Sequence, residues 1–229
     1  MSDIFREVDE DLRHEQYKRL WDRFGTYVIL LAILIVVATA GWRLWEYWQL
    51  KQAEATGSRF VAALSLAEKG DHQAALDAFR AIEADGSGRY PILARFRAAT
   101  ERAATGDVTG AVADFDAIAS SADTPALLQD LAKLRAATLL ADTASLADMQ
   151  GRISSLAETG NPWRHSAREL LGLVAWRTGD LEVARDYYEE ILEDQERPPE
   201  LQSRAQFMVA LIRGRIGEPA PAPASQPQG

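Results

Sequence analysis

Hydrophobic residues recur along most of the chain at intervals of three and four, and one stretch near the start is apolar throughout. Intervals of three and four place side chains on one face of an α-helix. No region shows the run of short alternating segments with regular turn residues that is typical of β-structure. The pattern therefore predicts an all-α protein.

The apolar stretch covers residues 24–42, FGTYVILLAILIVVATAGW, which are nineteen residues without a charge in a chain that is 26% charged. A helix of this length rises about 28 Å, close to the roughly 30 Å of a hydrocarbon core. A helix in the core of a soluble protein would normally carry polar residues along one face. The stretch is therefore predicted to be a transmembrane anchor.

The flanks of the stretch support a membrane span with a defined orientation. Aromatic side chains stand at both ends: Trp21, Phe24, Tyr27, Trp42, Trp45, Tyr47 and Trp48. Such rings favour the two headgroup layers. Lys18, Arg19 and Arg23 precede the span, and a short basic tail followed by a long domain favours a cytoplasmic N-terminus. We expect a cytoplasmic tail over residues 1–23 and a helical connector at the membrane surface over 43–57.

Cleavage of an export signal is the alternative for this segment. Ala38, Thr39 and Ala40 have the small-x-small form of a signal peptidase site. The region before the apolar stretch, however, is long and holds seven acidic against five basic residues. The aromatic run WRLWEYW after the site is also typical of an interfacial helix that continues outward. The pattern favours an uncleaved anchor.

Three segments of the remaining chain share one frame: GDHQAALDAFRAI at 70–82, GDVTGAVADFDAI at 106–118 and GDLEVARDYYEEI at 179–191. Each has Gly-Asp, then an alanine, an aromatic residue four later and an isoleucine three after that. Gly70 and Gly106 are 36 residues apart, and Gly106 and Gly179 are 73 apart, about twice as far. A weaker copy is therefore expected between them, and residues 141–153 fill the place, keeping Asp142 and Ile153.

Each frame predicts a pair of helices. The glycine ends a first helix in the left-handed conformation, and the aspartate caps a second helix by accepting backbone N–H bonds. Amphipathic runs precede the four frames at 58–69, 91–105, 126–140 and 163–178, and a last helix over 199–215 would cap the stack. We expect a repeat domain over 58–217 and a disordered Pro/Ala tail over 218–229.

A period of about 36 with this helix–turn–helix pattern resembles the tetratricopeptide repeat, whose unit is about 34 residues. The fourth unit fits best, and its matching residues are Leu171, Gly172, Ala175, Ala184 and Tyr188. The first unit departs, because Ala63 stands where the family's glycine is usual. The resemblance implies a binding scaffold whose first helices line a concave groove.

By that family's spacing, the groove residues would be Phe60, Leu64, Phe96, Thr100, Leu128, Leu131, Arg135, Leu173, Trp176 and Arg177. Most are apolar, so the groove would accept apolar segments of unfolded or membrane-bound clients. The alternative is that they pack between helices, as apolar residues at helical spacing usually do. Arg135 and Arg177 would anchor acidic groups of a peptide, or be solvated or paired locally.

The order of elements along the whole chain gives a more specific resemblance than the repeats alone. The approach VDEDLRHEQYKRLWDRFG, one span, four repeats and a capping helix resemble the ancillary SecYEG translocon subunit family of α-proteobacteria, over residues 5–215. The resemblance implies repeats in the periplasm at the inner membrane. It also implies association with the SecYEG translocon, with a membrane-anchored periplasmic chaperone and with unfolded exported proteins. A related periplasmic repeat protein coordinates cell-wall synthesis with division, which leaves an anchored envelope scaffold as the alternative.

Composition restricts the chemistry. The net charge of −9 argues against nucleic acid, which needs a basic face, and the lack of cysteine excludes disulfides and thiolate ligands. The three histidines lie on separate segments, and no nucleotide-binding or nucleophile motif occurs. We therefore expect no enzyme activity, no catalytic residue, no cofactor and no metal. His72 and the Glu189–Glu190 pair are expected to be exposed to solvent.

Overall fold

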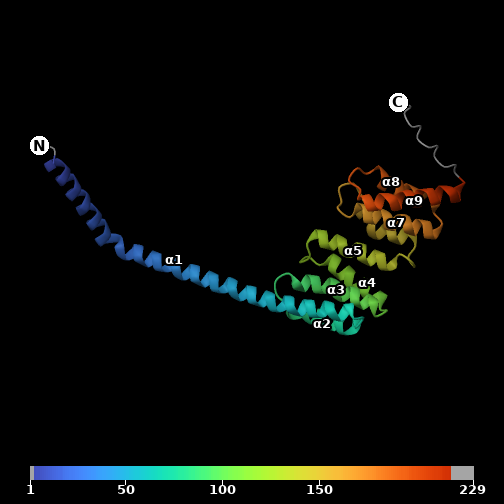
Figure 1. Cartoon of the computed structure of the whole chain (residues 1–229), viewed down its shortest axis with the longest axis horizontal. Coiled ribbons are helices and arrows are strands. Elements are labelled where there is room, and N and C mark those ends of the chain that lie inside the picture. The colour runs from blue at the N-terminus through green and yellow to red at the C-terminus, as the bar shows by residue number, and fades with distance from the viewer. Residues whose placement is uncertain (1–2, 218–229) are drawn as a thin grey trace, which may run out of the picture. The chain divides into compact units, whose positions relative to one another are not determined.

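The computed structural model describes residues 3–217, and all regular structure in this range is helical (Figure 1). Helix α1 covers Asp3–Glu68. It is followed by α2 (His72–Asp85), α3 (Tyr90–Ala104), α4 (Val108–Ser120), α5 (Ala126–Leu140), α6 (Leu146–Ala157), α7 (Arg164–Thr178), α8 (Leu181–Glu193) and α9 (Pro199–Ile216). The all-α prediction is confirmed, while the predicted tail over 218–229 lies outside the described residues.

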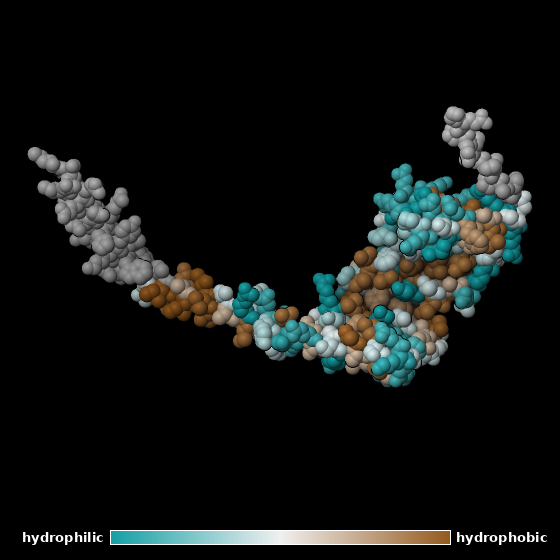
Figure 2. All heavy atoms as spheres, viewed as in Figure 1, coloured by the Kyte–Doolittle hydropathy of each residue, from teal (hydrophilic) through white to brown (hydrophobic). Residues whose placement is uncertain are grey.

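The chain divides into two units between Ala55 and Thr56. In the first unit, the large apolar side chains of α1 from Ile29 to Val37 are all more than half exposed, and Figure 2 shows them as a brown band. From Gly25 onward the helix is long and apolar enough to cross a membrane. It continues without interruption through residues 42 and 57, so the borders of anchor and connector stay predictions.

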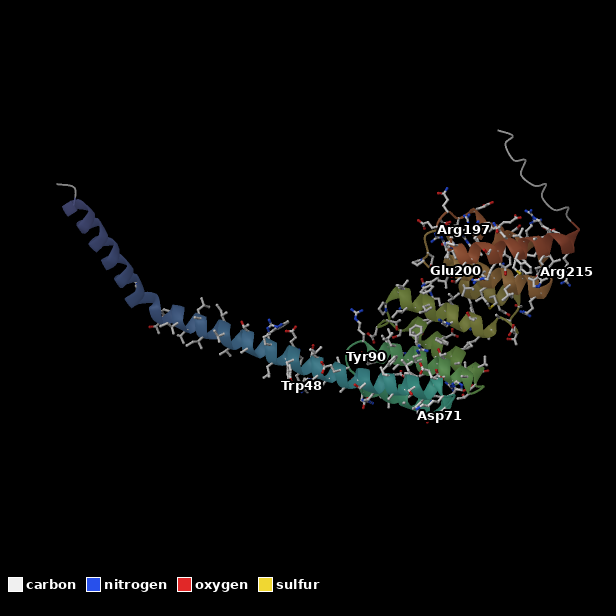
Figure 3. All side chains as sticks on the ribbon, viewed as in Figure 1. Trp48, Asp71, Tyr90, Arg197, Glu200 and Arg215 are labelled. Atoms are coloured by element: carbon white, nitrogen blue, oxygen red, sulfur yellow. The ribbon has the colours of Figure 1, made fainter. Side chains whose placement is uncertain are left out.

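The second unit is a stack of helix pairs closed by α9, and the last turns of α1 supply its first helix (Figure 1). The three Gly-Asp junctions share the predicted left-handed glycine, but the aspartate caps the second helix in only the first two, because the side chain of Asp180 makes no capping hydrogen bond. Gly70, Gly106 and Gly179 adopt left-handed φ angles of 82°, 95° and 89°. The carboxylates of Asp71, labelled in Figure 3, and Asp107 accept bonds from backbone nitrogens at 3.3 Å and 2.9 Å. These contacts end one helix and start the next.

The junction of the third repeat, between α5 and α6, differs from the prediction. Ser145, not Asp142, caps α6, because its hydroxyl accepts from the backbone N–H of Asp148 at 3.1 Å. No glycine ends α5, and Ala141 stays right-handed, so the chain turns once more before the extended Ser145 can cap the next helix. The register of the third copy is therefore three residues later than expected, which corrects the alignment on Asp142.

The second helix of each pair buries the same positions when its residues are numbered from the capping residue. Four, eight and eleven residues after Asp71 lie Ala75, Phe79 and Ile82, and all three are buried. In α6 the buried residues at these positions after Ser145 are Met149, Ile153 and Leu156. Ile153 thus replaces the aromatic residue and not the isoleucine.

The eighth position is the centre of each core cluster. Phe79, Phe115, Ile153 and Tyr188 each lie in a separate cluster that joins one second helix to the first helices on both sides. Burial of one such side chain stabilises the fold by about 1.5–3 kcal/mol. Every first helix from α3 to α7 contributes to two clusters, so the core is continuous along the stack.

One glycine of the fourth pair is required by close packing. A Cβ atom on Gly172 would lie 2.9 Å from Cε2 of the Tyr188 ring, which is too close for a real contact. The corresponding Ala63 of the first pair is buried in one cluster with Phe79, which takes the eighth position there and packs edge-on against Phe60 at 5.3 Å. The two pairs therefore fill the same gap with different residues.

The corrected register predicts that Ser145, and not Asp142, stabilises the start of α6. Ser145→Ala should lower the free energy of unfolding by about 0.5–2 kcal/mol, because the N–H of Asp148 loses its acceptor. Asp142→Ala should change it by less than about 0.5 kcal/mol, because Asp142 is exposed and caps nothing. Urea unfolding of the purified chain in mild detergent measures both. A larger loss of stability in Asp142→Ala than in Ser145→Ala would support the original alignment on Asp142.

Candidate protein-binding groove

A groove of about 730 Å³ opens between α5, α7 and α9 in the second unit. Its lining residues are Leu131, Leu134, Arg135, Thr138, Trp163, Ser166, Glu169, Leu170, Leu173, Tyr188, Ser203, Arg204, Phe207 and Met208. Leu134, Leu170 and Tyr188 are buried and form the floor. Cavities of this size and character are typical of binding sites.

Helical spacing brings these side chains to the groove. On α7, Ser166, Leu170 and Leu173 follow at intervals of four and three, and so lie on one face. Figure 3 labels Glu200 and Arg215 at the two ends of α9, and Phe207 lies between them on that helix. The buried stripe of each helix packs against the second helices, which leaves another stripe to line the groove.

The wall of the groove exposes apolar surface to water. Leu173 is 46% exposed and Phe207 is 67% exposed. In Figure 2 the brown side chains of the second unit gather over the middle of the stack. Exposed apolar side chains that gather in one groove mark a binding surface more often than scattered ones do.

The two arginines of the groove differ in whether a nearby carboxylate neutralises their charge. The guanidinium of Arg204 donates two bonds to the Glu169 carboxylate, at 2.8 Å and 3.0 Å, so this pair is internally neutralised. Arg135 is exposed and has no ion-pair partner among the side chains that the structure describes. Burial raises the pKa of the Tyr188 phenol to about 12, so it stays neutral. The groove therefore carries one uncompensated positive charge.

Three of the residues predicted from spacing lie in this groove: Leu131, Arg135 and Leu173. They come from α5 and α7, which are neighbouring first helices that share a core cluster. Their role in binding stays a prediction, but the structure brings them together as the spacing indicated.

The other predicted residues lie elsewhere on the first helices. Phe60 and Leu64 pack against the first core cluster, and Phe96 packs against Phe115 at 6.0 Å. Thr100, Leu128, Trp176 and Arg177 do not line this groove. The Trp176 ring lies 5.0 Å under the guanidinium of Arg215, and the Arg177 guanidinium donates to the carbonyl of Ala144.

Sequence reasoning missed the contribution of α9. The buried face of this helix is Leu201, Ala205, Val209 and Ile212. Phe207 lies off that stripe, and an aromatic residue outside the buried stripe of a helix is a signal that the sequence contained. The same reasoning missed Thr138 on α5, because the register of the third pair was misplaced by three residues.

An ion cluster around two buried arginines secures the loop between α8 and α9. Arg164 donates to the carboxylates of Asp194 at 2.6 Å and Glu196 at 2.7 Å, while Arg168 meets Glu190 at 3.0 Å. The hydrogen bond from Arg164 holds the pKa of Asp194 well below its usual range. Arg164 and Arg168 are buried, so loss of their partners would leave an uncompensated charge in the interior. The cluster has a structural role.

Two surface predictions need correction. The Glu189–Glu190 pair is not simply solvated, because Glu189 accepts from Arg213 at 2.6 Å and Glu190 meets Arg168. His72 is partly buried, and its Nδ1 lies 2.8 Å from the buried Glu101 carboxylate. In both cases the ion pairs join residues of two different helices. The sequence pattern within a single helix does not reveal such pairs. No group of three metal-ligating side chains occurs among the side chains that the structure describes.

The sequence matches the tetratricopeptide repeat-like domain over residues 18–206, which is most of the chain. The chain belongs to this family. No curated protein and no solved structure matches it significantly. Tetratricopeptide-like repeats are typically non-catalytic scaffolds, so the family indicates a role in protein–protein interaction. The groove on α5, α7 and α9 is a solvent-open, largely apolar cleft of this tetratricopeptide-like stack.

His165 predicts a pH dependence of stability. Burial lowers the pKa of this imidazole, despite Asp194 at 3.6 Å. The unfolded chain, with a histidine pKa of about 6.5, then binds the proton more readily, so the free energy of unfolding falls as pH drops below about 6.5. The pKa of Asp194 is lowered as well, but the stability that this carboxylate contributes is lost only as pH falls below its ordinary pKa of about 3.9, outside this window.

The measurement is the urea midpoint of the chain from about pH 7 to pH 5. His165→Gln should flatten the decrease. An unchanged slope in His165→Gln would show that other groups cause the pH dependence.

Proposed function

We propose that the chain is a non-enzymatic accessory subunit of the Sec translocon. Residues 24–42 anchor it in the bacterial inner membrane, residues 1–23 face the cytoplasm, and the repeat domain over 58–217 lies in the periplasm. The repeats bind the SecYEG translocon, a membrane-anchored periplasmic chaperone and unfolded exported proteins. The order of anchor and repeats, together with the translocon-subunit resemblance, supports this proposal.

The open groove is the observation that carries the proposal. Leu173 and Phe207 keep apolar surface in water at a cost in free energy, which a partner's apolar side chain would relieve on binding. Segments of unfolded proteins that emerge from a translocon expose such side chains. A groove with an apolar wall, a polar rim and one free arginine can bind many partner sequences and does not require a particular one.

The apolar stretch of α1 supports the membrane location. Its side chains from Ile29 to Val37 have no protein partner within the described chain, and hydrocarbon is the environment that suits them. The exposed rings of Trp42, Trp45 and Trp48 follow this stretch, as in an aromatic belt.

Photocrosslinking in the native cells tests the proposal. A photoreactive amino acid in place of Leu173 should crosslink to translocon subunits, to a periplasmic chaperone or to exported proteins. The matched control places the same residue at Ser155, an exposed position of α6 outside the groove. We expect at least about fivefold fewer of these products from the control, because the groove is the binding surface.

Mass spectrometry of the crosslinked products identifies the partners. Cell-wall or division proteins without translocon subunits would contradict the export proposal and favour the envelope scaffold. Equal yields from Leu173 and Ser155 would show that the groove is not the binding surface.

A further inference from the structure

The last helix of the stack keeps a packing position for which the described part of the chain has no partner. In the first helices α1, α3 and α7, the residue seven places before the left-handed glycine is small and buried: Ala63, Ala99 and Gly172. Helix α9 also ends at a left-handed glycine, since Gly217 has a φ of 80°. Seven residues before it stands Ala210, which is small but exposed. Helix α9 therefore has the form of a first helix whose packing position is open.

This small residue marks where a second helix packs. In the fourth pair, the Tyr188 ring of α8 lies so close to Gly172 that an added Cβ atom would be 2.9 Å from Cε2. No described residue follows Gly217 to cover Ala210 in the same way. The sequence after Gly217, EPAPAPASQPQG, contains four prolines and predicts no second helix. These residues therefore do not supply the missing helix.

Contacts between the second helices show where a fifth one would lie. The guanidinium of Arg152 in α6 donates two bonds to the Asp116 carboxylate in α4, at 2.7 Å and 3.1 Å. The amide of Gln150 in α6 donates to the Tyr187 hydroxyl in α8 at 3.1 Å. Each second helix thus packs on its own first helix and lies beside the preceding second helix. By this rule the next second helix would lie on α9 and beside α8.

A groove of about 530 Å³ is present at this place, between α8 and α9. It shares no lining residue with the groove on α5, α7 and α9, so the two are separate surfaces. Its lining residues are Glu189, Leu192 and Glu193 of α8 and Gln206, Val209, Ala210 and Arg213 of α9. We call it the end groove.

The third pair indicates what the incoming helix would carry. Arg152 directly precedes Ile153, the large buried residue at the eighth position of α6. Its partner Asp116 lies nine residues after the cap of α4, and Glu189 lies nine residues after Asp180 on α8. A basic residue at the place of Arg152 in an incoming helix would therefore reach Glu189, as Arg152 reaches Asp116.

The α8 side of the end groove is acidic. Intervals of four, three and four residues place four carboxylates on one face of α8: Glu182, Asp186, Glu189 and Glu193. Arg185 and Arg213 pair with members of this row. Two guanidinium groups do not balance four carboxylates, so the rim is complementary to a basic partner.

We propose that the end groove binds an amphipathic helix of another protein, which completes the stack as the second helix that α9 lacks. A large apolar side chain of the incoming helix packs against Ala210, and a basic residue directly before it pairs with Glu189. The site is distinct from the groove on α5, α7 and α9, and it requires neither the translocon nor a membrane.

Binding of a helical peptide to the full-length chain in mild detergent tests the proposal. The probe is a labelled peptide with the α6 sequence SLADMQGRISSLA, residues 145–157, held helical by a crosslink between side chains on its outer face. Two matched peptides carry Ile153→Asp or Arg152→Glu. By fluorescence anisotropy, the parent peptide should bind about tenfold more tightly than either one. Equal binding of the parent and the Ile153→Asp peptide would overturn the proposal.

Filling the end groove locates the binding surface. Ala210→Trp places a large side chain where the incoming residue would pack, and it should weaken peptide binding about tenfold. The matched control is Ala113→Trp, at an exposed alanine of α4, which should leave binding unchanged. Binding that survives Ala210→Trp would contradict the proposal, as would an equal loss in Ala113→Trp.

Sedimentation of the same proteins separates another protein from a second copy. The full-length chain should have the same mass in solution with and without Ala210→Trp. A dimer that Ala210→Trp dissociates would show that a second copy occupies the end groove, and would overturn the assignment to another protein.

A fusion tests the site without depending on the affinity of a free peptide. Replacement of residues 218–229 by the α6 sequence places the helix directly after Gly217. The urea midpoint should rise, because a helix that packs only on the folded stack stabilises it. Ile153→Asp in the added segment should remove the rise, and no rise with the parent sequence would refute the proposal. Neither result affects the groove at Leu173, which crosslinking tests separately.

Discussion

The repeat domain depends on one packing interaction, which is the burial of a large side chain of each second helix between two consecutive first helices. Phe79, Phe115, Ile153 and Tyr188 fill this position, and each is central to its own cluster. Because a first helix serves the clusters on both sides, no pair is stable by itself, and stability is shared along the stack.

This packing also creates the groove. A first helix that buries one stripe against the second helices carries its remaining residues on the side away from them. On α5, α7 and α9 these residues are leucine, phenylalanine and arginine, and they surround a cavity of about 730 Å³. The same constraint that holds the stack together therefore provides the surface on which a partner can bind, without chemistry in the chain itself.

The sequence predicted the helices well because their signals are local. Gly-Asp junctions combine a left-handed glycine with a capping carboxylate, and at Gly70–Asp71 and Gly106–Asp107 the structure has both. The third junction was misplaced because Ser145 gives a weaker signal than Gly-Asp, and Asp142 fitted the period better.

The composition of the groove was harder to predict because it depends on three helices at once. Spacing identified Leu131, Arg135 and Leu173, but it could not show that Phe207 joins them from α9. The pairing of Glu169 with Arg204 joins helices 35 residues apart in the chain, so the difference between a neutralised and a free arginine appears only in the folded stack.

Hydrogen exchange of the full-length chain, alone and with the partner that copurifies from native membranes, tests the central claim most directly. The account predicts that binding slows exchange in α3, α5, α7 and α9, because a ligand on the first helices suppresses their local opening. The second helices α2, α4, α6 and α8 should change much less. Protection confined to the second helices would contradict the claim that the groove is where this protein meets its partners.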